Sequence, residues 1–267
     1  MVPTKKDTPF IPISPQEIIE EVHEACEKGI TLAHLHARDD DGRPAYQAEA
    51  YGPIFEGLRK HCPDLVICAS LSGRDFPLLQ QRAEVLQLEP DMGSLTLGSL
   101  NFPNQASVNE PATILGLIHE MARHGVHPEL ECFDPGMINY AHFLIRKGML
   151  RPPYYFNLLF GNIASAQADM AYVGLMIRDL PQDSYWALAG IGTEQLKMNA
   201  LAIACGGGVR VGLEDNIWWD AARKQKATNI GLLNRIHELA GMFERPIMTS
   251  RQFGDAGFYN SKRKAPV

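Results

Sequence analysis

The sequence is poor in cysteine and has no pattern that pairs the cysteines it contains. Its five cysteines are scattered and include no C-x-x-C pair, so neither a disulfide framework nor a thiolate zinc site is predicted. No apolar run approaches the roughly 20 residues of a membrane span, and the opening ten residues lack the apolar core of a signal peptide. These absences favour a soluble, cytoplasmic protein without a membrane partner.

An excess of positive charge is also missing. The 25 Lys and Arg residues are outnumbered by 31 Asp and Glu residues, which gives a formal net charge of -6. Proteins that bind nucleic acid usually carry a basic surface, so this class of partner is not expected. The length of 267 residues and the hydrophobic fraction of 45% suit one large core. We therefore expect a single domain over residues 1–267.

What the chain does contain is a regular alternation of helical and β-rich segments. Ser14, followed by Pro15 and Glu17, predicts a helix that starts with a capping box and runs to about residue 29. Another helix is predicted over residues 47–61. The β-rich segments occupy residues 31–38, 65–72, 91–99, 128–134, 154–161, 184–190 and 209–215.

Strands that alternate with helices predict a parallel sheet. The spacing of about 25 to 35 residues per unit favours a (β/α)8 barrel, the TIM barrel, over an open sheet. Seven strands are one too few for such a barrel, so we expect that its first strand is lacking and would precede residue 1. A seven-stranded open α/β sheet is the alternative.

Two histidines stand two residues apart near the end of the first β-rich segment. Alternate residues of a strand share a face, so His34 and His36 should lie side by side. Imidazole is a common ligand of zinc, and the carboxyl ends of barrel strands form the active face. A pair of structural histidines satisfied by hydrogen bonds is the other interpretation.

Charged residues occur in or next to two later β-rich segments. Glu214 and Asp215 end the last segment, and Glu214 with two imidazoles would leave a catalytic zinc one open position. The alternative is that both residues only begin a loop and cap a helix. Glu131 lies in an apolar strand, where a carboxylate is costly unless it is paired or used. Arg210 could pair with Asp215 or Glu131, as part of a site or as a structural salt bridge.

Hydroxyl side chains follow two further β-rich segments, at Ser70, Ser94 and Thr96. Their convergence at one end of the sheet would supply hydrogen-bond donors to a ligand. The glycines at 206–208 are not assigned to phosphate binding, because they enter a strand from its amino end. They are expected to end a helix and form a turn.

A resemblance to a known family extends over about residues 2 to 250. The motifs that carry it are HLHARDDDGRP, ICASLSGR, DMGSLTLGSLNFP, PELECFDPGMINY, YFNLLFGN, LAGIG and GGGVRVGLEDN. In this order they resemble the β-keto acid cleavage enzymes, zinc-dependent barrels that use acetyl-CoA. The resemblance implies condensation of a β-keto acid with acetyl-CoA and retro-Claisen cleavage to acetoacetate and a new acyl-CoA.

The resemblance also implies roles for individual residues. His34, His36 and Glu214 would bind zinc or another divalent metal, and Asp215 would be the general base, oriented by Arg210. The substrate carboxylate would be held by Ser70 together with Ser94 or Thr96. Glu131 would face the variable end of the substrate. A homo-oligomer, either dimer or tetramer, is expected.

Two other functions compete with this interpretation. A metal-dependent hydrolase of the amidohydrolase type also carries an H-x-H pair on a barrel strand, but needs further histidines at later strand ends. A catalytically inactive barrel that survives as a binding protein is the second alternative. Metal content measured together with turnover would separate the three.

Overall fold

The computed structural model describes residues 3–263, which form an α/β fold. The parallel strands are β1 (Leu32–Leu35), β4 (Val66–Ala69), β5 (Met92–Thr96), β8 (His127–Cys132), β9 (Tyr154–Phe160), β10 (Ser184–Gly190) and β11 (Gly208–Val209). Hydrogen bonds order them as β1-β4-β5-β8-β9-β10-β11. Within the described chain this sheet has seven strands, the number predicted. The expected loss of a first strand remains a prediction.

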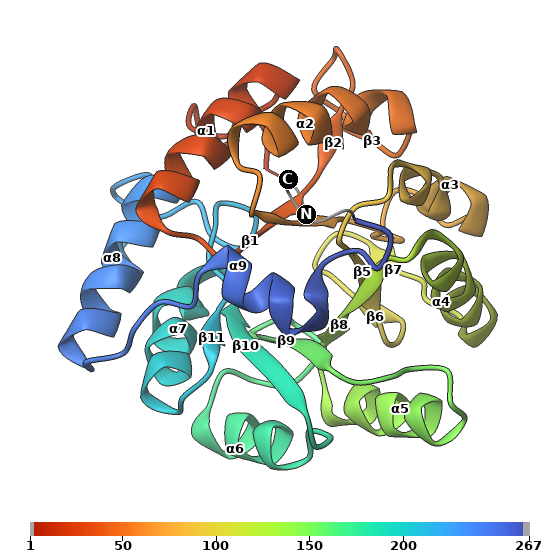
Figure 1. Cartoon of the computed structure of the whole chain (residues 1–267). Coiled ribbons are helices and arrows are strands. Elements are labelled where there is room, and N and C mark those ends of the chain that lie inside the picture. Colours follow the sequence, from red (N-terminus) through yellow and green to blue (C-terminus); the bar gives the residue numbers. More distant parts are fainter. Residues whose placement is uncertain (1–2, 264–267) are drawn as a thin grey trace. The chain divides into compact units, whose positions relative to one another are not determined.

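Helices alternate with the parallel strands along the chain, beginning with α1 before β1 (Figure 1). They are α1 (Pro15–Lys28), α2 (Ala48–His61), α3 (Leu79–Ala83), α4 (Pro111–His124), α5 (Pro135–Arg146), α6 (Met170–Arg178), α7 (Gln195–Ala204), α8 (Asn229–Met242) and α9 (Ser250–Phe253). Two short antiparallel pairs are β2 (Ala37–Arg38) with β3 (Pro44–Ala45), and β6 (Leu100–Asn101) with β7 (Ala106–Ser107). Three short helical turns are η1 (Glu84–Leu88), η2 (Gly192–Glu194) and η3 (Gly254–Phe258).

The described chain divides into two compact units. Unit 1 comprises residues 3–11, 96–110 and 130–246, and unit 2 comprises residues 12–95, 111–129 and 247–263. Each unit has buried apolar side chains of its own. The prediction of a single domain is left as a prediction.

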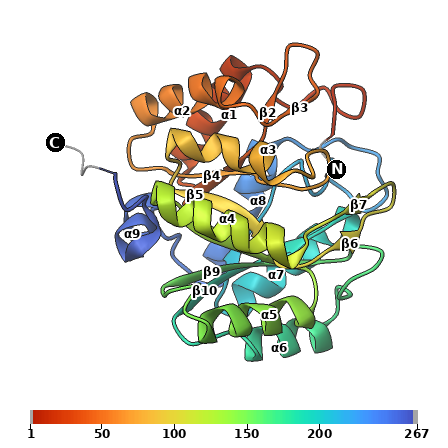
Figure 2. The same cartoon turned by 90° about the vertical axis from the view of Figure 1, so that its right-hand side faces the viewer.

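In unit 2, helices α1 and α2 lie side by side (Figures 1 and 2). Ile18 of α1 and Ile54 and Leu58 of α2 are buried. Gly57 of α2 faces the end of the Ile19 side chain of α1, where a Cβ would lie 2.4 Å from Cδ1, so a larger residue would require that side chain to move. The parallel pair β1 and β4 then continues with β5.

In unit 1, β9 and β10 form the longest parallel pair, in register from Tyr154 opposite Ser184 to Phe160 opposite Gly190. All seven residues of β9 are buried. Gly207, in the turn between α7 and β11, lies against Trp186, where a Cβ would meet the ring at 2.0 Å. The Gly207 N–H donates to the Ala202 carbonyl at 2.9 Å and Gly206 has a φ of 88°, so these glycines end α7 and form a turn, as expected.

The start of α1 agrees with its prediction. The Ser14 hydroxyl accepts the Glu17 N–H at 3.2 Å, and the Glu17 carboxylate accepts the Ser14 N–H at 2.9 Å. Because each bond satisfies an amide that the helix leaves without a partner, Ser14→Ala should lower the free energy of unfolding by about 1 kcal/mol. Urea denaturation measures the loss, with the exposed Glu24→Ala on the same helix as control. Equal midpoints for the two variants would contradict the prediction.

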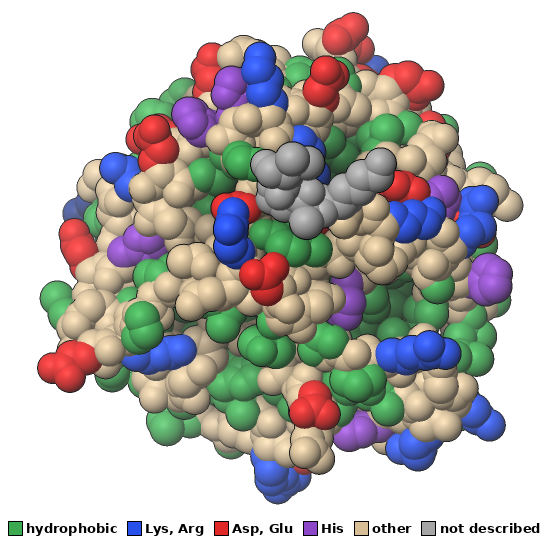
Figure 3. All heavy atoms as spheres, viewed as in Figure 1, with side chains coloured by type: hydrophobic (Ala, Val, Ile, Leu, Met, Phe, Trp, Pro, Cys, Tyr) green, Lys and Arg blue, Asp and Glu red, His purple; other side chains and the backbone are tan. Residues whose placement is uncertain are grey.

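The surface carries charges of both signs. On the face drawn in Figure 3, acidic and basic side chains are interspersed. No helix within residues 3–263 combines the length and the apolar composition needed to cross a bilayer.

Candidate active site and metal ligands

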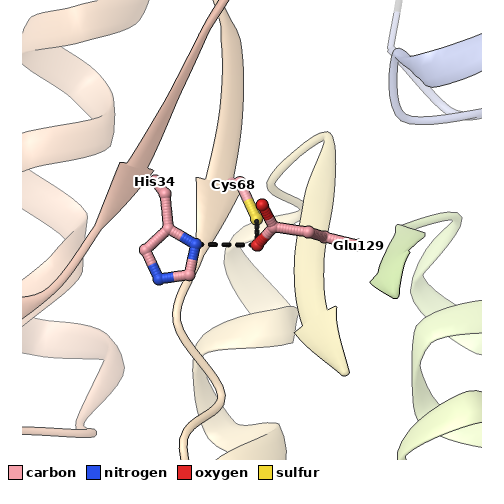
Figure 4. Close-up of side chains that lie close together, drawn as sticks. All are labelled: His34, Cys68 and Glu129. Carbon is pink, nitrogen blue, oxygen red and sulfur yellow. Dashed lines mark hydrogen bonds and ion pairs between the residues drawn. The ribbon is translucent and has the colours of Figure 1, made fainter. Parts of the chain in front are cut away.

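Unit 2 brings together an imidazole, a thiol and a carboxylate (Figure 4). The parallel register places His34 of β1 directly opposite Cys68 of β4, so both side chains lie on one face of the sheet. Glu129 of β8 reaches the same place. Its Oε2 accepts a hydrogen bond from His34 Nδ1 at 2.7 Å and from Cys68 Sγ at 3.2 Å.

His36 follows β1 directly and lies beside His34, with ring centroids 5.2 Å apart. The predicted pairing of these two imidazoles is therefore confirmed.

Unit 1 gathers three carboxylates around one guanidinium group. Arg210 donates from Nη1 to Glu131 at 2.9 Å, from Nη2 to Glu214 at 2.9 Å and from Nε to Asp215 at 3.3 Å. The Thr96 hydroxyl donates to the second oxygen of Glu131 at 2.8 Å. The predicted pairing of Arg210 with Asp215 or Glu131 is thus observed with both, and Glu214 is added.

The cluster is rich in carboxylate oxygens, three of which contact Arg210. The arginine side chain is only 11% exposed, so solvent screens these ion pairs poorly. Carboxylate oxygens are among the ligands that zinc takes in proteins.

The segment that carries Glu214 and Asp215 differs from its prediction. A strand was expected over residues 209–215, but β11 ends at Val209. The chain then turns at Gly212, whose carbonyl accepts the N–H of Asp215 at 3.2 Å. Glu214 and Asp215 therefore lie in a turn, where a spacing of four residues brings Glu214 to Arg210.

Side chains of two helices hold this turn in place. Asn199 of α7 donates to the Arg210 carbonyl at 2.9 Å, and the side-chain oxygen of Asn229 accepts the Leu213 N–H at 2.8 Å. The Asp215 carbonyl accepts the N–H of Gly192 at 2.8 Å. The acidic pair is thus fixed by backbone contacts that do not involve its carboxylates.

The predicted serines lie in unit 2, Ser94 within β5 and Ser70 directly after β4. Ser94 is buried in β5, and its hydroxyl accepts the Leu71 N–H at 2.9 Å. Ser70 directly follows β4 and donates its N–H to the Leu35 carbonyl at 3.0 Å. Their binding roles remain predictions.

Cys68 and Glu129 were not predicted as site residues. The argument applied to Glu131, that a carboxylate in an apolar strand needs a purpose, holds equally for Glu129 two residues earlier. Its side chain is 1% exposed. No signal in the sequence singled out Cys68, because its place beside His34 depends on strand register.

Cys132, also on β8, is not suited to act as a nucleophile. Burial raises the pKa of its thiol well above the usual value, and the nearby carboxylates of Asp134 and Glu131 raise it further. The thiol therefore stays protonated at neutral pH.

The histidines needed by an amidohydrolase-type site lie elsewhere. His127, at the start of β8, packs edge-on against Phe258 with ring centroids 4.9 Å apart. His142 lies within α5 and its Nε2 contacts the Asp179 carbonyl at 2.8 Å. Both are held by structural contacts, which weighs against that alternative.

A parallel α/β fold with clustered carboxylates, an arginine and paired imidazoles defines an enzyme of acid–base or metal-assisted chemistry. The chain belongs to the β-keto acid cleavage enzyme family, whose sequence model matches residues 1–254. The resemblance found in the sequence is thereby confirmed.

Named relatives cover nearly the whole chain. It is 36% identical over 248 residues to the 3-keto-5-aminohexanoate cleavage enzyme of Fusobacterium nucleatum, covering 92% of this chain and 90% of the relative. It is 34% identical over 254 residues to the 3-oxoadipate:acetyl-CoA acetyltransferase of Cupriavidus necator, covering 94% and 89%.

The fold recurs in a solved structure described as a ternary complex of ObcA with C4-CoA adduct and oxalate. The TM-score is 0.80 at 21% sequence identity, and the match covers 94% of this chain and 68% of that chain. At this identity the likeness concerns the fold alone.

Proposed function

We propose that this protein condenses a β-keto acid with acetyl-CoA and cleaves the adduct by a retro-Claisen reaction, releasing acetoacetate and a new acyl-CoA. Family membership and the acetyl-CoA-dependent relative support the reaction class. The observation that carries the proposal is the contact of Arg210 with Glu131, Glu214 and Asp215. It brings a candidate base and a candidate metal ligand into one cluster.

The proposed ligands of a divalent ion, zinc for preference, are His34, His36 and Glu214. Two neutral imidazoles and one carboxylate are a usual catalytic set that leaves an open position. When bound there, the ion would supply electrostatic stabilisation of the enolate oxygen. The pairing of the two imidazoles and the contact of Glu214 with Arg210 both favour this assignment.

Asp215 is the proposed general base. It would take a proton from the carbon between the keto and carboxylate groups, and the resulting carbanion would attack the acetyl thioester. The Arg210 Nε–H donates to Asp215 at 3.3 Å, which orients the carboxylate and favours its ionised form. Arg210 is therefore proposed to position the base and not to react itself.

The remaining polar groups are proposed to bind the β-keto acid. Ser70, with Ser94 or Thr96, would donate hydrogen bonds to its carboxylate, and Ser94 is preferred because the Thr96 hydroxyl donates to Glu131. Glu131 would face the other end of the substrate, where its two bonds, to Arg210 and Thr96, fix its direction. A polar or cationic substituent would suit that end best.

We also propose that the parallel strands belong to a (β/α) barrel. The alternation of strands with helices and the likeness to ObcA support it.

A screen of β-keto acids with acetyl-CoA tests the reaction. We expect acetoacetate to form together with a new acyl-CoA for at least one substrate with a polar or cationic end. Treatment with a chelator should abolish this activity, and added zinc should restore it, because the ligands hold the ion only by coordination. Protein dialysed without chelator is the control.

Other outcomes of these assays would support a different function. Cleavage that requires water but not acetyl-CoA would favour a hydrolase. Bound zinc without turnover on any substrate would favour a binding protein. Full activity after complete removal of the metal would contradict the proposed ligand set.

A further inference from the structure

Glu129 is a carboxylate that lies in the protein interior and not on the surface. Its side chain is 1% exposed, and the His34 side chain that it contacts is 10% exposed. A carboxylate at this depth costs several kcal/mol unless hydrogen bonds offset its desolvation. Two of these bonds reach a single oxygen, Oε2, from His34 and from Cys68. His34 and Cys68 therefore donate to the same carboxylate oxygen of Glu129.

The distances between the donor atoms of His34, Cys68 and Glu129 distinguish this cluster from a set of three metal ligands. The nearest potential ligand atoms of His34, Cys68 and Glu129 all lie within 4.8 Å of one another, so the three residues could be taken for ligands of one ion. Donor atoms around a tetrahedral zinc, at about 2.0 to 2.2 Å from it, lie at least about 3.3 Å apart. The 2.7 Å between His34 Nδ1 and Glu129 Oε2 is too short for that arrangement. It is the length of a charge-assisted hydrogen bond.

We propose that Glu129 is a positioning residue that keeps the His34 proton on Nδ1 and so directs Nε2 toward a divalent ion. The inference rests on the proposed function, in which His34 is a metal ligand. The Cys68 thiol orients the carboxylate by donating to the same oxygen, and the β1–β4 register puts it there. Carboxylates that accept the second N–H of a ligating histidine fix its tautomer and ring orientation.

Zinc affinity of the metal-free protein tests the proposal, measured by competition with a chromophoric chelator. Glu129→Ala should weaken binding by about 10- to 100-fold, the usual effect of losing such a partner. Glu129→Gln should lose less, because its amide oxygen can still accept the His34 N–H. Cys68→Ala should also lose less than Glu129→Ala. Cys132→Ala, which removes an equally buried thiol of β8, is the matched control and should bind zinc like the wild type.

Nitrogen-15 NMR of the histidine rings in the metal-free protein gives a readout that a purely structural role would not change. His34 should carry its proton on Nδ1 in the wild type and become a mixture of tautomers in Glu129→Ala. If the alanine variant does not fold, Glu129→Gln is measured in its place and should show a shifted tautomer balance. Unchanged tautomers together with wild-type zinc affinity would overturn the proposal.

The outcomes also separate this inference from the proposed function. If His34→Ala loses zinc but Glu129→Ala does not, only the role of Glu129 fails. If the wild type binds no zinc, the ligand assignment fails. The effect of Glu129→Ala on the His34 tautomer then still shows whether Glu129 determines that tautomer. A sulfur-to-cobalt charge-transfer band in cobalt-loaded protein that Cys68→Ala removes would make Cys68 a ligand and overturn the proposal.

Discussion

Asp215→Asn should lower kcat by about 10²- to 10⁴-fold, the usual contribution of a positioned general base. Asparagine keeps the shape of the side chain, and its amide oxygen can still accept the Arg210 Nε–H that lies 3.3 Å from Asp215. It cannot take up a proton at neutral pH. The loss should therefore appear in kcat, measured as acetoacetate release at saturating substrate.

Zinc content and folding should stay at wild-type values, because Asp215 is proposed as a base and not as a ligand. Asp179→Asn is the control, since it removes a carboxylate of the same unit that forms only an exposed ion pair with Arg178. Its kcat should equal that of the wild type. A kcat for Asp215→Asn within a few-fold of the wild type would show that another group removes the proton.

The local parts of the fold could be predicted because they depend on neighbours in the sequence. The capping box of Ser14 and Glu17 involves residues three apart, and its pattern predicted α1 correctly. The parallel strands were found because apolar β-rich segments alternate with helical ones. The last strand was predicted too long. It ends at Val209, and the chain turns at Gly212.

The site could be predicted only where one strand or one short segment determines it. The pairing of His34 with His36 follows from their spacing of two. The place of Cys68 opposite His34 follows from the register between β1 and β4, which no local pattern specifies. In the same way, Arg210 was expected to pair with Asp215 or Glu131, and it contacts both, together with Glu214 in the turn after β11.

The largest loss of stability should come from a residue outside the candidate site, Asp91. It is completely buried in unit 2. Its carboxylate lies 2.8 Å from Arg59 Nη2 and 3.0 Å from Arg263 Nη1, and accepts the N–H groups of Ile67 at 2.9 Å and Asn260 at 3.1 Å. One side chain thus ties α2, β4 and the C-terminal segment together.

Asp91→Asn should lower the free energy of unfolding by about 3 to 5 kcal/mol, the cost of leaving buried charges without their partner. Burial already lowers the pKa of Arg59, an effect that Asp91 partly offsets. Removing the negative charge therefore leaves two arginines facing each other around a neutral amide. Urea denaturation followed by circular dichroism measures the change in midpoint.

Asp64→Asn is the matched control, because it makes the same substitution in an aspartate–arginine pair of the same unit. Arg251 Nη2 lies 3.0 Å from Asp64 Oδ1, but the two side chains are 64% and 40% exposed. Solvent and salt screen such a pair, so its loss should shift the midpoint far less than the loss of Asp91. Equal shifts for the two variants would mean that the buried cluster contributes no more than a surface ion pair, and that the C-terminal segment is held by its apolar contacts and backbone hydrogen bonds instead.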